Sequence, residues 1–118
     1  MNPMPFDGQP EKFETTDDTV KVLLDAAQLI RERGLARGEG TDAQGRLCAI
    51  GALYVARLGT FSDTISEAAK TLGAFLGISP ERIYIWSDNA RDASEVIAAL
   101  EGAAARRALS LKSSAERE

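Results

Sequence analysis

Two residue types that occur once each, cysteine and tryptophan, mark the stretches whose side chains could do chemistry. Cys48 falls at or near the start of a predicted helix, where free amide groups and the helix dipole stabilise a thiolate. A thiolate nucleophile works with a base, and because the chain has no histidine, carboxylates or lysine would have to serve. The commoner alternative is a buried structural cysteine among small neighbours.

The tryptophan stretch, Trp86-Ser87-Asp88-Asn89, is a polar turn that leads into a predicted helix. Polar side chains beside free helix amides could bind an anion or a carbonyl group. Under a simpler interpretation, Trp86 anchors the core and Asp88 or Asp92 caps the last helix. Both interpretations stay open at the level of sequence.

Composition excludes several classes of protein. One cysteine and no histidine argue against a zinc site, and no calcium-loop spacing is present, so we expect no metal and no cofactor. A lone cysteine forms no intramolecular disulfide, and the N-terminus lacks the basic and apolar regions of a signal peptide, which indicates a cytoplasmic protein. The longest apolar run has roughly 12 residues where a membrane span needs about 20, so no membrane association is expected.

The net charge of −4 is concentrated near the N-terminus. Residues 1–18 already carry all of it, because their acids outnumber their one cation: Asp7, Glu11, Glu14, Asp17 and Asp18 against Lys12. The neutral remainder offers no basic footprint for a phosphate backbone, so we expect no nucleic-acid partner. A helix-turn-helix over residues 47–76 has suitable lengths, but its second helix carries Asp63 and Glu67 against Lys70, which disfavours DNA.

The stretch from Leu47 to Leu58 is predicted to be the central helix. Arg57 is its only charge, and a helix that is apolar nearly all round must be enclosed by other elements. One face carries small residues at helical spacing: Cys48, Gly51, Ala52 and Ala56. Small side chains allow close approach, so this face either packs against the first or last helix or forms a groove for a ligand or partner helix.

The first helix is predicted from Thr16, as N-cap, to Arg33, with Gly34 as C-cap. Its apolar residues recur at helical spacing and form one stripe. The connection that follows, residues 34–46, is too polar and too rich in glycine to be helical. A short hairpin at residues 42–45 is an alternative to an irregular loop, although few β-branched residues support it.

Two more helices follow from capping-box patterns, in which a hydroxyl or carboxylate precedes a glutamate by three residues. The third helix opens with Thr64-Ile65-Ser66-Glu67 and ends before Gly77. The last helix opens with Asp92-Ala93-Ser94-Glu95 and continues to about Ser110. Each pattern places an acidic side chain in the first turn, where it suits the helix dipole.

The segment between these two helices gives conflicting signals. Ser79-Pro80-Glu81 is a good helix opening, with serine as N-cap and proline in the first turn. The residues that follow, 82–86, are mostly β-branched or aromatic and favour a strand. We predict a short helical turn and keep an edge strand as the alternative.

These elements predict an all-α fold, a small single-domain bundle of four main helices around a central apolar helix at about 47–58, with a one-turn or extended segment near 80–86. Residues 16–110 form the helical domain. Residues 1–15 form a flexible acidic arm whose large apolar groups are Phe6 and Phe13, because this segment cannot bury enough surface to order itself. Residues 111–118 form a charged, frayed tail.

Two motifs resemble those of a family of small uncharacterised proteins from actinobacteria and their phages: Gly45-Arg46-Leu47-Cys48-Ala49-Ile50-Gly51-Ala52-Leu53 and Ile85-Trp86-Ser87-Asp88. The resemblance covers about residues 20–105 and departs at Ser87, where asparagine is expected. It implies no established activity. It implies an accessory role in an actinobacterium or phage, and it makes four residues the candidate ligand-binding positions: Arg46, Cys48, Trp86 and Asp88.

The leading functional hypothesis is a non-enzymatic protein-binding factor, such as a phage protein that engages or inhibits a host protein. Small size and the absence of a recognisable catalytic constellation motivate it. The alternative is a small-ligand-binding protein or enzyme with a pocket among the four candidate positions, and no catalytic residue is assigned. DNA binding through a helix-turn-helix is the third hypothesis. The sequence does not indicate an oligomeric state.

Overall fold

The computed structural model describes residues 17–37, 42–58 and 64–116, with side chains described as far as Leu111. The predicted arm at 1–15 and the predicted turn after residue 58 lie outside these residues. The described part contains α-helices, one 3₁₀ turn and no strand, so the predicted all-α class is confirmed. Among the described helices, none has the length and apolarity needed to cross a membrane.

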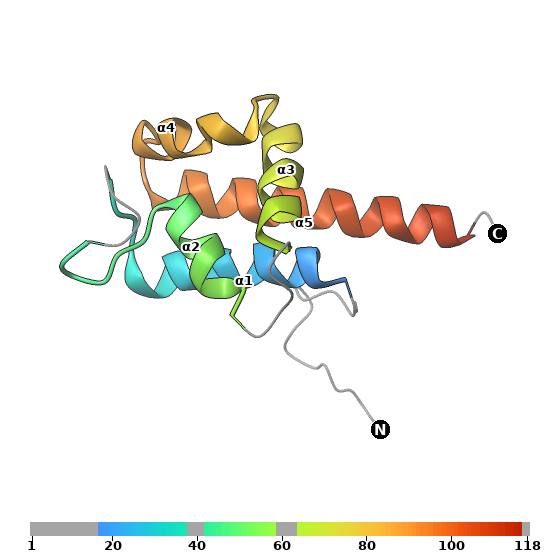
Figure 1. The fold of residues 1–118 in the computed structure, drawn as a ribbon, viewed down its shortest axis with the longest axis horizontal. Helices are drawn as coiled ribbons and strands as arrows, with labels where there is room; N and C mark the ends of the chain where they lie inside the picture. The colour runs from blue at the N-terminus through green and yellow to red at the C-terminus, as the bar shows by residue number, and fades with distance from the viewer. Residues whose placement is uncertain (1–16, 38–41, 59–63, 117–118) are drawn as a thin grey trace, which may run out of the picture.

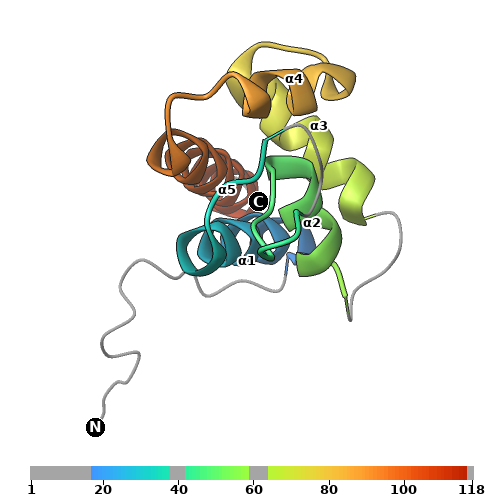
Figure 2. The ribbon, with the colours of Figure 1, turned by 90° about the vertical axis from the view of Figure 1, so that its left-hand side faces the viewer.

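The described residues form five α-helices and the turn: α1 (Asp18–Arg33), α2 (Ala49–Ala56), α3 (Thr64–Leu76), η1 (Pro80–Arg82), α4 (Ile83–Asp88) and α5 (Ala93–Glu116). α1 and α5 lie side by side, run in opposite directions and make the most extensive contact between helices (Figure 1). α2 and α3 cover this pair on one side, and α4 lies against α2 and η1 (Figure 2). The C-terminal end of α5 projects beyond the other helices (Figure 1).

The predicted 47–58 helix is present in a shorter form as α2, which contacts α1, α3 and α4. The core lies between α1 and α5, while α2 is shorter than predicted and covers part of it. Eight residues span only about 12 Å, and the contacts with other helices involve the inner side of α2. The inner side of α2 is buried, whereas Tyr54 is 52% exposed and Leu58, just beyond the helix, is 69% exposed. α2 makes its most extensive helix contact with α1, and Gly51 and Ala52 of the small-residue face are buried, which supports the packing alternative.

The start of α1 differs by one residue from the prediction. Asp17, not Thr16, is the N-cap, and its carboxylate accepts a hydrogen bond of 2.8 Å from the N–H of Val20. A carboxylate satisfies a free amide and also stabilises the positive end of the helix. The predicted C-cap at Gly34 is confirmed, with φ of 94° and its N–H bonded to the carbonyl of Ile30.

α3 ends as predicted at Gly77, whose φ of 78° is easily adopted only without a side chain. The N–H of Ile78 donates to the carbonyl of Gly73 at 2.9 Å, and that of Gly77 donates to Ala74 at 3.3 Å. These two bonds satisfy free carbonyl groups at the helix end. They also fold the chain back so closely that a Cβ on Gly73 would lie 2.7 Å from the carbonyl oxygen of Ile78.

The segment near 80–86 is helical throughout, so the edge-strand alternative is wrong. Pro80 opens η1 and α4 continues from it to Asp88, which places the start of the predicted polar turn inside a helix. Helical geometry puts Ile83 and Ser87 one turn apart, and both are buried. With no neighbouring strand among the described residues, β propensity has no partner to act through.

The last helix starts as predicted and ends later. The Asp92 carboxylate accepts from the N–H of Glu95 at 3.1 Å, which confirms the N-cap. In a capping box, Glu95 would accept from the N–H of the N-cap residue, Asp92. Instead, Glu95 accepts from the N–H of the preceding residue, Arg91, at 2.9 Å. α5 continues past the predicted end near Ser110 to Glu116, because this stretch is rich in helix-forming residues and lacks a stop signal.

The close approach of Gly73 to Ile78 predicts an unusual glycine substitution. Alanine in a helix normally stabilises relative to glycine by about 1 kcal/mol. At Gly73 the added methyl group would meet a backbone oxygen, so we expect Gly73→Ala to lower the free energy of unfolding by about 1–3 kcal/mol in urea denaturation. Ser66→Ala, at an exposed position of the same helix, is the control and should stay within about 0.5 kcal/mol. Stabilisation by Gly73→Ala would contradict the packing at this helix end.

Candidate functional site

The two motif stretches meet through a residue pair that was not among the predicted site residues. The buried Ser87 hydroxyl on α4 accepts a hydrogen bond of 3.0 Å from the N–H of Ala49, the first residue of α2. This amide has no partner within its own helix, and Ser87 satisfies it from 38 positions away in sequence. The contact fixes α4 on the start of α2. The sequence offered one signal for this contact, which is the serine at position 87 where the resembling family has asparagine.

Cys48 lies at the start of α2, as predicted, and serves as its N-cap. Its Sγ accepts from the N–H of Gly51 at 3.4 Å, and the residue is only 4% exposed. Together, Cys48 and Ser87 accept from two of the first amides of α2. This contact supports the structural interpretation of the cysteine. Its ligand-binding role stays a prediction.

Arg46 interacts with its own loop. Its Nε lies 2.6 Å from Oδ2 of Asp42, and Oδ1 of Asp42 accepts from the N–H groups of Arg46 and Gln44. This is a tight turn at residues 42–46 with Gly45 at a φ of 82°, and it takes the place of the hairpin that was kept as an alternative to an irregular loop. Beyond the turn, Leu35 and Leu47 form an isolated parallel bridge. Arg46 is thus held by an ion pair within the loop.

Trp86 is half-buried and packs against the core, which agrees with its interpretation as a core anchor. Asp88 is the last residue of α4, and its carbonyl accepts from Nη1 of Arg37 at 2.8 Å. Nη2 of the same guanidinium donates to the carbonyl of Arg91 at 3.2 Å. Arg37, which the sequence reasoning missed, therefore connects the segment after α1 to backbone carbonyls at and just after the end of α4.

The four predicted side chains do not share the cavity that Arg46 lines. This cavity measures about 310 Å³, and it is bounded by Leu35, Arg37, Asp42, Ala43, Gln44 and Arg46. The structure brings the two motif stretches together at the start of α2, but Arg46 faces the cavity of its own loop. A ligand site built from all four residues stays a prediction.

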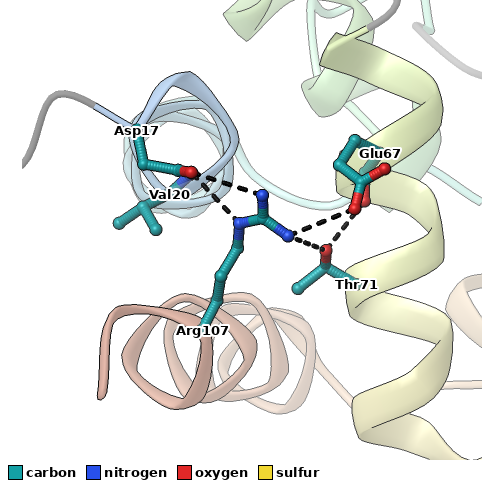
Figure 3. A network of polar contacts seen from close by, with 5 residues as sticks. All are labelled: Asp17, Val20, Glu67, Thr71 and Arg107. Atoms are coloured by element: carbon teal, nitrogen blue, oxygen red, sulfur yellow. Dashed lines mark hydrogen bonds and ion pairs between the residues drawn. The ribbon is translucent and has the colours of Figure 1, made fainter. Parts of the chain in front are cut away.

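A second polar centre, the Arg107 junction, joins three helices (Figure 3). Arg107 on α5 donates to both oxygens of Asp17, with Nε at 3.1 Å and Nη2 at 3.3 Å. Its Nη1 donates to Glu67 on α3 at 3.2 Å and to the hydroxyl of Thr71 at 3.3 Å. Four hydrogen bonds thus hold one guanidinium between the α1 N-cap and the middle of α3.

The junction shifts the proton affinities of its members. Partial burial by itself raises the pKa of Asp17, but hydrogen bonds from Arg107 and from the N–H of Val20, together with the charge of Arg107, outweigh it and lower this pKa. The hydrogen bond with Asp17 raises the pKa of Arg107 in spite of burial, and the charges of Asp17 and Glu67 add to the effect. Both groups therefore stay ionised across the physiological range.

Sequence reasoning assigned Asp17 and Glu67 only to helix starts and missed Arg107. A signal was present, because Arg107 continues the buried stripe of α5 formed by Leu100, Ala103 and Ala104. A cation on an apolar stripe must be paired with acceptors when the helix packs. The pattern indicates an inward arginine, although it does not identify the partners.

Beside the junction lies a cleft of about 320 Å³, here called the α3–α5 groove. Residues on one face of each helix line it: Glu67, Lys70, Thr71 and Ala74 from α3, and Ala103, Arg106, Arg107, Ser110 and Leu111 from α5. Both sets recur at intervals of three and four, so each forms a continuous stripe along its helix. Two packed helices therefore present their facing stripes as an open trough.

The groove combines a small apolar floor with cationic sides. Ala74 and Ala103 are its smallest lining side chains, and Leu111 is 42% exposed at one end. Lys70 on α3 and Arg106 on α5 are exposed, and in the described part of the chain neither pairs with an acid. A chain of net charge −4 thus carries a locally cationic groove.

No candidate metal centre occurs among the described residues, where no three potential ligands from cysteine, aspartate and glutamate gather. Residues 14–106 match the model of a family of unknown function, DUF6197. No curated protein and no solved structure matches the chain.

The Ser87 contact predicts a loss of stability without a change in the groove. Ser87→Ala leaves the Ala49 N–H buried without an acceptor, so we expect the free energy of unfolding to fall by about 1–3 kcal/mol in urea denaturation. Ser79→Ala is the matched control, because Ser79 is exposed and its side chain makes no cap hydrogen bond. Equal effects of the two substitutions would show that the Ser87 hydroxyl contributes nothing.

The lowered pKa of Asp17 predicts a pH-dependent contribution to stability. A carboxyl with a lower pKa in the folded state stabilises the fold above its unfolded pKa of about 3.9, and this contribution disappears as the pH falls through the folded value. We expect Asp17→Asn to cost about 1–2 kcal/mol at pH 7 and progressively less below about pH 4. Asp25→Asn, at an exposed position on α1, should cost little at either pH. A pH-independent cost of Asp17→Asn would contradict the junction as an ionic contact.

Proposed function

We propose a function from the geometry of this chain, because the family to which the chain belongs, DUF6197, has no known function. The protein is a small non-enzymatic binding module that docks a partner protein in the α3–α5 groove. The observation that carries this proposal is the groove itself, an open trough with a small apolar floor between cationic side chains on two helices.

The shape of the groove favours a protein segment over a small molecule. Sites for small molecules enclose most of the ligand surface. Here the side chains of Lys70, Ala74, Arg106 and Ser110 are exposed along the groove, so it is open on its outer side. A chain segment laid along the two stripes contacts the floor and both cations at once.

The walls of the groove are held in place before any partner binds. The Arg107 junction ties α3 to α5 at one side of the groove. Next to it the Phe75 ring packs so closely on Gly102 that a Cβ there would lie 2.5 Å from Cζ of the ring. A preformed groove lowers the entropic cost of association, because little of the site has to be ordered on binding.

The docking face extends beyond the groove along the projecting end of α5 (Figure 1). Leu111 is 42% exposed on this part of the helix. Leu111 continues the stripe of Ala104 and Ala108, which is buried further back against the bundle. Exposed apolar side chains that continue a buried stripe are typical of a surface that another protein covers.

We propose that this binding module is encoded by an actinobacterium or its phage and acts in the bacterial cytoplasm, where it engages or inhibits another protein. The motif resemblance supports the origin. The single cysteine, buried as an N-cap, supports a reducing compartment, because the fold uses no disulfide.

Filling the groove should abolish binding. Ala74 is exposed and lines the groove, so Ala74→Trp occupies it, whereas Ala98→Trp adds the same side chain at an exposed position of α5 outside it. Tagged full chains are used to capture partners from a lysate of the source organism, with quantitative mass spectrometry. We expect one saturable partner, retained by Ala98→Trp and reduced about tenfold or more by Ala74→Trp.

Circular dichroism checks that both tryptophan variants are folded. Equal capture by the two variants would exclude the groove as the docking site. The absence of any saturable partner would count against the protein-binding function itself.

A further inference from the structure

We infer that the segment bound in the α3–α5 groove is an amphipathic helix with acidic residues beside its apolar stripe; this inference rests on the proposed function. The charge of the groove, the composition of its floor and the backbone groups that a partner must satisfy all favour this kind of segment.

The charge balance of the groove selects for an acidic partner. The guanidinium of Arg107 is compensated by Asp17 and Glu67. Lys70 and Arg106 have no acidic partner among the described residues, so they are the uncompensated charges of the groove. An acidic segment gains two ion pairs here, and a basic segment meets two like charges.

The positions of the polar groups suit carboxylates. Arg106 and Ser110 lie one helical turn apart on α5, so a carboxylate between them can accept from a guanidinium and a hydroxyl together. Lys70 offers an ammonium group from the opposite helix. Acidic residues on both sides of the partner's apolar stripe would therefore meet donors on both helices.

The walls favour a helix over an extended peptide. An extended segment keeps its backbone groups paired by adding to a sheet edge, and the described part of this chain has no strand. A helix satisfies its own backbone and can place leucine or phenylalanine side chains over the floor. Ala74 and Ala103 leave room for such larger side chains between the two helices.

Nucleic acid is a poorer fit, although phosphate would also pair with Lys70 and Arg106. The carboxylate of Glu67 lines the same groove, and the apolar floor offers nothing to a sugar-phosphate backbone. Two uncompensated cations on a chain of net charge −4 give little long-range attraction for a polyanion. A thymidine oligonucleotide is therefore the competing ligand in the test.

The test uses two synthetic helical peptides of about 18 residues, long enough to form a stable helix. Both carry the same leucine stripe, flanked by glutamate in one peptide and by lysine in the other. Binding to the full chain is measured by fluorescence anisotropy at low and physiological ionic strength. We expect the acidic peptide to bind about tenfold more tightly than the basic one, with a smaller preference at higher salt.

Charge reversal provides the matched control. Lys70→Glu with Arg106→Glu should remove or invert the preference for the acidic peptide. Lys21→Glu with Arg82→Glu changes the net charge by the same amount at exposed positions that do not line the groove, and it should leave the preference intact. Equal responses of the two double variants would overturn the inference, since the preference would then reflect total charge.

Ala74→Trp separates failure of the inference from failure of the proposed function. If it weakens both peptides about tenfold but neither is preferred, the groove binds protein and the acidic inference is overturned. If it changes neither peptide's affinity, both proposals fail. No measurable binding of the acidic peptide, or tighter binding of the thymidine oligonucleotide, also overturns the inference.

Discussion

The structure depends on a guanidinium held where three helices meet. Transferring an arginine from water into a packed junction is costly unless its donors and its charge are satisfied, and removing one partner leaves the others uncompensated. Asp17, Glu67 and Thr71 supply the acceptors for Arg107. Asp17 also caps α1, so one carboxylate both starts this helix and ties it to α5. The positions of α1, α3 and α5 are therefore linked through one side chain, and the groove beside it is a consequence of that arrangement.

At the other end of the molecule, α4 is held by contacts that are equally long in range. A six-residue helix has almost no stability of its own, because helix initiation is unfavourable and few hydrogen bonds follow it. Ser87 attaches α4 to the first amide of α2, and Arg37 donates to the carbonyl of its last residue, Asp88. Arg37 and the start of α2 thus provide the stabilising contacts that a helix of this length cannot form by itself. These contacts explain why the two motif stretches lie together at the start of α2.

The sequence predicted the elements that local chemistry determines and missed those that depend on distant partners. The C-caps at Gly34 and Gly77 and the N-cap at Asp92 are local, since each depends on one residue and its nearest turns. The burial of α2 is not determined locally. Its apolar composition indicated that it would be buried, but the extent of burial depends on which other helices contact it. In the same way, Arg107 and Asp17 are 90 positions apart, and no spacing pattern connects them. The apolar stripe of α5 could have indicated an inward arginine, but it does not identify the acceptors.

The candidate site shows why rare residues are an uncertain guide to function. Cysteine and tryptophan stand out in a sequence, yet here Cys48 caps a helix and Trp86 packs against the core. The groove is built from common side chains, and its character comes from which of them face each other across two helices. The net charge of the chain hides this, because an average over all residues loses the local excess at Lys70 and Arg106. In the junction that stabilises the bundle, Arg107 compensates the charge of Glu67. The remaining cations therefore determine the charge that the groove presents to a partner.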